Sequence, residues 1–192
     1  MAGNVNRAKA EIPTIDCALV TIALEDGTEF GFKTANHVAV ETQFETQDAV
    51  KLVVKGKLIA QKPEESTITG NQITLTDNVF NPELVLVLQG GVIKFDTEEP
   101  TKIIGYAPPV AGSDDKGQVF SMNCYSAQYS ASGQIVQYEK TSYPNCQGVP
   151  ISFSSEDGVF RAPEYVINSA PNIGQSPYEI NYVQGLPELQ TA

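Results

Sequence analysis

Basic residues are scarce in this chain: 12 lysines and arginines stand against 23 acidic residues among 192, which gives a formal net charge of -11. Such a surface repels phosphate backbones, so the charge balance argues against nucleic-acid binding by charge attraction. It does not exclude a passive conduit for DNA, because like charge keeps a conduit from adhering to its cargo. Charged residues make up 18% and apolar residues 41% of the chain, a composition that favours folding over disorder.

Tryptophan is absent and histidine occurs once, as His37. One histidine cannot form a histidine-rich metal site or a helical His-x-x-x-His pair. His37 directly precedes an alternating segment, and a surface position at a strand edge is its expected place. Because Trp is absent and the eight tyrosines are scattered over the C-terminal half, an aromatic carbohydrate groove has little support.

Cysteine is also sparse, and its three positions follow no metal-ligand spacing: Cys17, Cys124 and Cys146. The first 13 residues lack the apolar core of a signal peptide, so we expect reduced thiols in a protein made in the cytoplasm. A Cys124–Cys146 disulfide stays open as an alternative. The longest strictly apolar run, Leu84–Leu88, has five residues, which is too short for a transmembrane helix.

Catalytic signatures are missing as well. The sequence contains no dinucleotide-binding glycine motif, no phosphate-binding loop and no nucleophile elbow. Three acidic doublets, Glu64-Glu65, Glu98-Glu99 and Asp114-Asp115, lie beside Pro or Gly in expected turns, where solvated charges are the simplest interpretation. We therefore expect no enzyme activity, no metal and no cofactor, although a Cys–His pair using His37 is not excluded.

Alternating β-strand patterns fill much of the chain. Residues 15–24 and 29–33 flank Asp26-Gly27, which predicts a hairpin with a type I′ turn. Further strands are expected in nine segments: 49–60, 72–76, 92–96, 101–106, 118–129, 134–142, 148–154, 159–162 and 165–167. The sequence thus predicts a mainly β fold in a single domain over residues 1–192, with an N-terminal arm (about 1–12) and an ordered C-terminal arm (about 171–192).

The segment 38–47 has the strictest alternation in the chain. One set of side chains is apolar or small, namely Val38, Val40, Thr42, Phe44 and Thr46. The other set is acidic or amide-bearing apart from Ala39 and contains no Lys or Arg: Glu41, Gln43, Glu45 and Gln47. A period of two predicts that the first face packs on the protein's own sandwich while the second meets water.

One short helix is expected, over residues 82–89. Asn81 can cap it, Pro82 suits the first helical position, and Gly90-Gly91 ends it. A helix of this length is unstable alone, so we expect its apolar residues to pack against the sheet: Leu84, Val85 and Leu88. A buried strand is the alternative, because short apolar runs are ambiguous.

Residues 42–91 carry a resemblance to a known family. The run 51–62 is followed by Ile-Thr-Leu-Thr-Asp (73–77), then by Phe-Asn-Pro-Glu (80–83), and finally by Gly90-Gly91. This order resembles the tail tube (major tail) proteins of tailed bacteriophages. The C-terminal half resembles that family only in its β-rich character.

The resemblance implies a β-sandwich or barrel-like core with one flanking helix. It also implies self-assembly into rings, usually hexameric, that stack through loops and arms into a hollow tube for genome delivery into the host. Its implied partners are further copies, a tape measure protein, a terminator and, in contractile tails, a sheath; DNA passes through without specific binding. The implied location is the virion tail, assembled in the bacterial host cytoplasm.

The alternating segment fits such a tube. We expect Glu41, Gln43, Glu45 and Gln47 to face the lumen, because an acidic wall without basic residues lets DNA slide. The two arms and the region 35–72 are candidates for contacts between rings. Two other classes remain open: a non-catalytic β-sandwich binding or adhesin-like module of a virion or cell surface, and a cytoplasmic enzyme of unfamiliar type.

Overall fold

The computed structural model describes residues 13–152, 156–158 and 160–189, and this part of the chain is mainly β with one short helix. Its largest sheet has eight strands in the order β2-β1-β9-β10-β11-β6-β3, with β12 also paired to β10. These strands are β1 (Thr14–Leu24), β2 (Glu29–Phe32), β3 (Ala35–Gln47), β6 (Glu65–Asp77), β9 (Phe120–Tyr129), β10 (Ile135–Gly148), β11 (Glu164–Ser169) and β12 (Glu179–Val183). The expected mainly β class is confirmed.

The first hairpin forms as predicted, but with a different turn. β1 and β2 pair around the loop 25–28, where the Leu24 amide donates to the Thr28 carbonyl at 2.8 Å. Of the loop residues, only Gly27 has a positive φ, of 87°. A type I′ turn needs two such residues, so the chain uses a longer loop in which the Thr28 amide donates to Asp26 Oδ1 at 2.8 Å.

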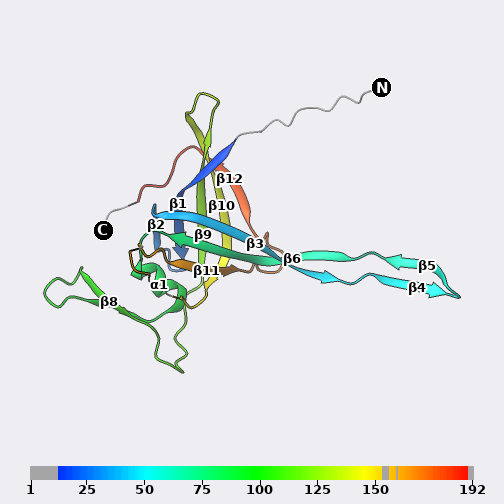
Figure 1. The fold of residues 1–192 in the computed structure, drawn as a ribbon, viewed down its shortest axis with the longest axis horizontal. Coiled ribbons are helices and arrows are strands. Elements are labelled where there is room, and N and C mark those ends of the chain that lie inside the picture. Colours follow the sequence, from blue (N-terminus) through cyan, green and yellow to red (C-terminus); the bar gives the residue numbers. More distant parts are fainter. Residues whose placement is uncertain (1–12, 153–155, 159, 190–192) are drawn as a thin grey trace.

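The sheet bends so that β3 also contacts β1, which gives the body the barrel-like form in Figure 1. Alternate residues of β6 and β11 point into this body, and Ile73, Leu75, Tyr165 and Ile167 are fully buried. They join apolar side chains from β1 and β9 in one core. The intervening residues of β6 and β11 are partly or fully exposed, so these two strands have the packed and wetted faces of a half-buried sheet.

The helix α1 (Pro82–Gln89) begins and ends where the sequence predicts. The Asn81 side-chain oxygen accepts from the Glu83 and Leu84 amides at 3.0 and 3.2 Å, and the Gly90 amide donates to the Leu86 carbonyl at 2.9 Å. Leu84, Val85 and Leu88 lie in the core with exposures of 0 to 1%. The alternative of a buried strand at this position is therefore wrong.

Two smaller sheets leave the body on opposite sides (Figure 1). One is the hairpin of β7 (Val92–Phe95) and β8 (Ile103–Ala107), which follows the helix. The other is the hairpin of β4 (Val50–Val54) and β5 (Lys57–Lys62), which continues the outer halves of β3 and β6. We call residues 41–72 the long hairpin; Figure 1 shows it projecting far from the body.

The long hairpin differs from the expected short strands. The segment 49–60 is split by Lys55 and Gly56, whose φ values of 48° and 77° match a two-residue type I′ turn. β6 has 13 residues, beginning at Glu65, where a strand was expected only over 72–76. On β3, the face expected to pack is only partly covered at Val38, and it is exposed from Val40 onward. Packing fails there because the strand has already left the body.

The C-terminal half also departs from the sequence-based strands in places. β10 continues six residues beyond the expected end at residue 142. Strands were also expected over residues 149–152 and 160–162, but neither segment forms one. The described part of the C-terminal arm, residues 171–189, is ordered through β12, which pairs with residues 138–142 of β10. The expected N-terminal arm, residues 153–155 and 159 of the expected short strands, and the last three residues lie outside the described residues.

Candidate assembly surfaces

Across residues 13–152, 156–158 and 160–189, no three His, Cys, Asp or Glu side chains gather as a metal site. His37 is exposed on β3. In this same part of the chain, no helix has the length and the apolar character needed to cross a membrane.

The three cysteines are unpaired thiols. Burial raises the pKa of the Cys146 thiol to about 11 and also raises the pKa values of Cys17 and Cys124. Cys146 is fully buried, and its sulfur donates to the Tyr143 carbonyl at 3.4 Å. Cys124 and Cys146 are small residues of the core, and Cys17 packs against it. The raised pKa values favour the protonated thiol over the nucleophilic thiolate.

A polar face runs across three neighbouring strands. Glu41 of β3, Gln72 of β6 and Asn168 of β11 lie in one row, and Gln72 Nε2 donates to Asn168 Oδ1 at 3.4 Å. Alternation along β3 places Gln43, Glu45 and Gln47 on this same face, all exposed. The paired positions on β6 and β11 also bring no Lys or Arg to the face. The four residues expected to face a lumen thus belong to one wet, acidic and amide-rich surface.

The opposite face of the long hairpin is apolar and uncovered. Phe44 of β3 pairs with Ile68 of β6, and their exposures are 66% and 47%. They continue the face on which Ile73 and Leu75 are buried inside the body. Apolar strand faces are normally buried, so this surface has the composition of a contact region that the single chain leaves without a partner.

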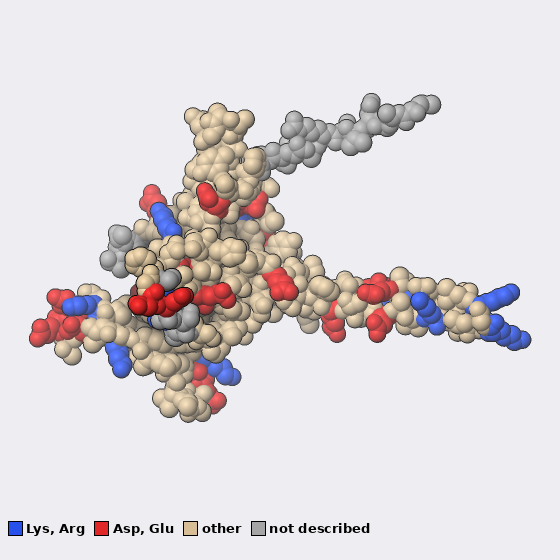
Figure 2. Space-filling view, in the orientation of Figure 1, with Lys and Arg blue, Asp and Glu red and all other residues tan. Residues whose placement is uncertain are grey.

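Charges are sorted along the long hairpin. Figure 2 shows acidic side chains nearer the body and basic side chains at the far end. Residues 49–63 contain four lysines and no acidic residue: Lys51, Lys55, Lys57 and Lys62. Glu65 forms an ion pair with Lys62 at 3.3 Å, and Lys62 Nζ also reaches Gln47 Oε1 at 3.5 Å. The polar face therefore meets its first cation only at its outer end.

The sheet has open edges. Within the described residues, β3 pairs only with β6, and β2 pairs only with β1. The outer edge of β3 thus presents unpaired backbone groups along much of its 13 residues. Monomeric proteins shorten, cover or charge such edges, because an open edge is a template for another strand.

A groove of about 820 Å³ lies where β2, α1 and the C-terminal arm meet. Its apolar lining comes from Leu24, Phe30, Leu86, Val87 and Leu189, and its acidic lining from Glu29, Glu83 and Glu188. Leu189 belongs to the last described segment and packs over Gly31, where an added Cβ would lie 2.8 Å from the leucine Cδ2. The arm therefore forms one wall of the groove.

Sequence reasoning identified the polar face but missed the long hairpin and the groove. The signal for the hairpin was present in Lys55-Gly56, a turn dipeptide between two β-prone runs. The groove left no signal, because its lining comes from segments far apart in the sequence.

No protein-family model and no curated protein matches the chain. Among solved structures, it is similar to a chain in the cryo-EM structure of the anti-feeding prophage (AFP) baseplate, 6-fold symmetrised. The TM-score is 0.37 and the identity 8%, over 91% of this chain and 97% of that chain. At this distance the likeness identifies no family for the chain.

Proposed function

We propose that this protein is a non-catalytic structural subunit of a phage-like virion that assembles with copies of itself into stacked rings, forming the tail tube for genome delivery. The observation that carries the proposal is that one strand has both an open edge and a polar face whose charged side chains are all acidic. Among the residues that the structure describes, β3 has no partner on its outer side, and it carries Glu41, Gln43, Glu45 and Gln47 on one face.

A ring of such subunits satisfies both features at once. If the edge of β3 pairs with a strand of the neighbouring copy, the backbone groups of that edge gain hydrogen bonds. Closing the ring joins the sheets into a barrel, and the polar face then lines its interior. Strands β3, β6 and β11 bring no Lys or Arg to that face, so phosphate groups passing along it find no cationic site at which to bind.

The apolar side of the long hairpin supports assembly independently. Phe44 and Ile68 lie beside each other and are largely exposed in the single chain. Contact with another copy would remove this surface from water, and each Å² of buried apolar area stabilises the contact by about 25 cal/mol.

Negative-stain microscopy and size-exclusion chromatography of the purified protein test the proposal. We expect rings or tubes over a range of salt and protein concentrations. Phe44→Asp is expected to abolish them, because it places a charge in the apolar contact without touching the monomer's core. Phe160→Asp is the matched control, since Phe160 is 97% exposed and lies outside the long hairpin.

A protein that stays strictly monomeric under all conditions contradicts the proposal. That outcome favours the adhesin-like binding module, which needs neither an open edge nor a polar inner face. Loss of folding in Phe44→Asp, measured by circular dichroism, is not expected, because the side chain is mostly in water already.

A further inference from the structure

We infer that the tip of the long hairpin of one copy docks into the groove between β2, α1 and the C-terminal arm of a second copy. This inference rests on the proposed function and names the two surfaces that make the axial contact. The tip is defined as residues 49–63, and the groove by the lining residues given above.

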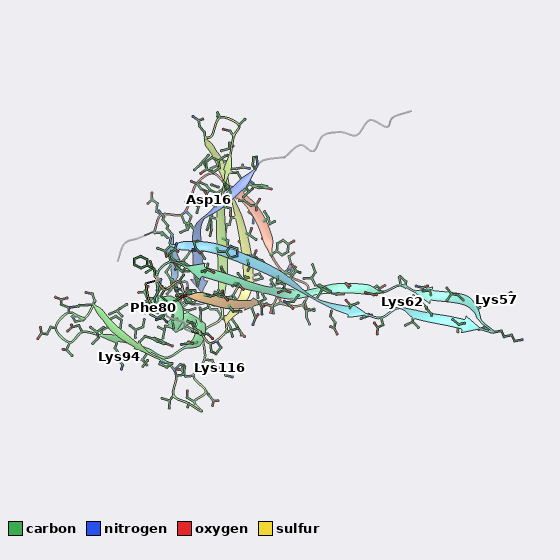
Figure 3. The ribbon with its side chains drawn as sticks, in the orientation of Figure 1. Asp16, Lys57, Lys62, Phe80, Lys94 and Lys116 are labelled. Atoms are coloured by element: carbon green, nitrogen blue, oxygen red, sulfur yellow. The ribbon has the colours of Figure 1, made fainter. Side chains whose placement is uncertain are left out.

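The tip is apolar and cationic. Val53, Val54, Leu58 and Ile59 of β4 and β5 are each about half exposed or more, so the tip is apolar on both faces. Four lysines surround these residues, in a protein whose net charge is -11. Figure 3 shows Lys57 at the outermost end of the hairpin and Lys62 further back along it. A cationic apolar ribbon is thus held away from an acidic body.

The groove is apolar and acidic. It has an apolar floor, and every ionisable side chain in its lining is a glutamate: Glu29, Glu83 and Glu188. The adjoining β1–β2 loop adds the exposed Glu25 and Asp26. An apolar surface with an anionic rim is complementary to an apolar ribbon carrying lysines, and this complementarity suits the tip better than it suits the acidic remainder of the chain.

The tip and the groove lie on different sides of the molecule. Figure 1 places β2 and α1 on the side of the body away from the long hairpin. A contact between the two ends of the molecule is heterologous, because each copy offers a tip on one side and a groove on the other. A heterologous contact builds an open assembly where its rotation does not close. In the proposed tube, the tip–groove contact would therefore add copies along the axis and complement the ring made by strand edges.

Two charge-reversed variants test the docking. The tip variant carries Lys55→Glu and Lys57→Glu; the groove variant carries Glu29→Lys and Glu188→Lys. All four side chains are exposed, so both variants are expected to fold, as circular dichroism checks. We expect each variant alone to form rings but no long tubes. Lys94→Glu, on the exposed β7–β8 hairpin (Figure 3), is the control that keeps tubes.

The two variants mixed together give the decisive measurement. The unchanged tip of the groove variant matches the unchanged groove of the tip variant, and the two reversed surfaces match each other. We therefore expect tubes to return in an equimolar mixture, as alternating copies. Sedimentation velocity and microscopy report both the loss and the recovery.

Two results overturn the inference while leaving the proposed function intact. One is tubes of wild-type length in either variant alone. In that case the changed surface makes no contact between copies and is free to bind another virion protein. The other is a mixture of folded variants that fails to recover tubes. A wild-type protein that never forms rings or tubes overturns the proposed function and this inference together.

Discussion

Close backbone contacts fix the position of α1 at the scale of single residues. Gly148, at the end of β10, lies directly against Leu88, and an added Cβ would come within 2.5 Å of the leucine Cα and Cβ. Gly117 meets the backbone of the same residue. These contacts involve backbone, which cannot move aside as a flexible side chain can, so only glycine fits while the helix keeps its place.

Gly148→Ala is therefore expected to lower the free energy of unfolding by about 1–3 kcal/mol, the range for overpacking a filled core. Urea denaturation measures the change. Gly185→Ala is the matched control, because a Cβ at Gly185 meets no atom within 4 Å. Equal stability of the two variants would show that the helix has room to shift.

At the scale of elements, the helix is the part that local sequence determines most completely. Its cap, first residue and end were all predictable, because a capping side chain, a proline and a glycine act on their own neighbours. Asn81 Oδ1 accepts hydrogen bonds from two backbone amides at the start of the helix. These amides have no carbonyl acceptor within the helix.

Asn81→Ala is expected to cost about 1 kcal/mol of stability, since it leaves these helix amides without an acceptor from the chain. Asn81→Ser is the control: a serine hydroxyl caps helices nearly as well and should retain most of the stability. Thermal and urea unfolding compare the variants. The same loss in both would contradict a capping role.

The strands were predictable in kind but not in extent. Alternation over 38–47 indicated a strand with a polar and an apolar face, and β3 has both. Alternation did not indicate where the strand leaves the body, because the pattern is the same whether the apolar face meets a core or another copy. Phe44 and Val40 look like core residues in the sequence for that reason. Pairings such as β12 with β10, and the groove, join distant segments and have no local signature.

At the scale of the whole molecule, the charge of the polar face is expected to decide whether DNA binds to the lumen of an assembled tube. The triple variant Glu41→Lys, Gln43→Lys and Glu45→Lys is expected to assemble, because these side chains are exposed and lie on the face away from the apolar contact. Its cationic lumen would bind phosphates, so genome ejection and infectivity should fall. The triple variant Thr97→Lys, Glu98→Lys and Glu99→Lys shifts the net charge equally, in the exposed turn of the β7–β8 hairpin.

Plaque counts and ejection assays on virions carrying each variant measure the effect. Normal infectivity of the polar-face variant would contradict the lumen assignment. An equal loss of infectivity in both variants would show that the change in net charge causes the defect.

The uncovered long hairpin also has a consequence for the kinetics of growth. A two-stranded ribbon in water is marginally stable, so in the free subunit the outer strands β4 and β5 gain little from their own pairing. If subunits assemble as proposed, much of the conformational entropy of straightening these strands is lost only when a second copy binds. We therefore expect the first contacts to form slowly and later ones faster, because an ordered neighbour is then already in place. The expected time course of assembly is a lag followed by rapid elongation, and preformed tube ends should remove the lag.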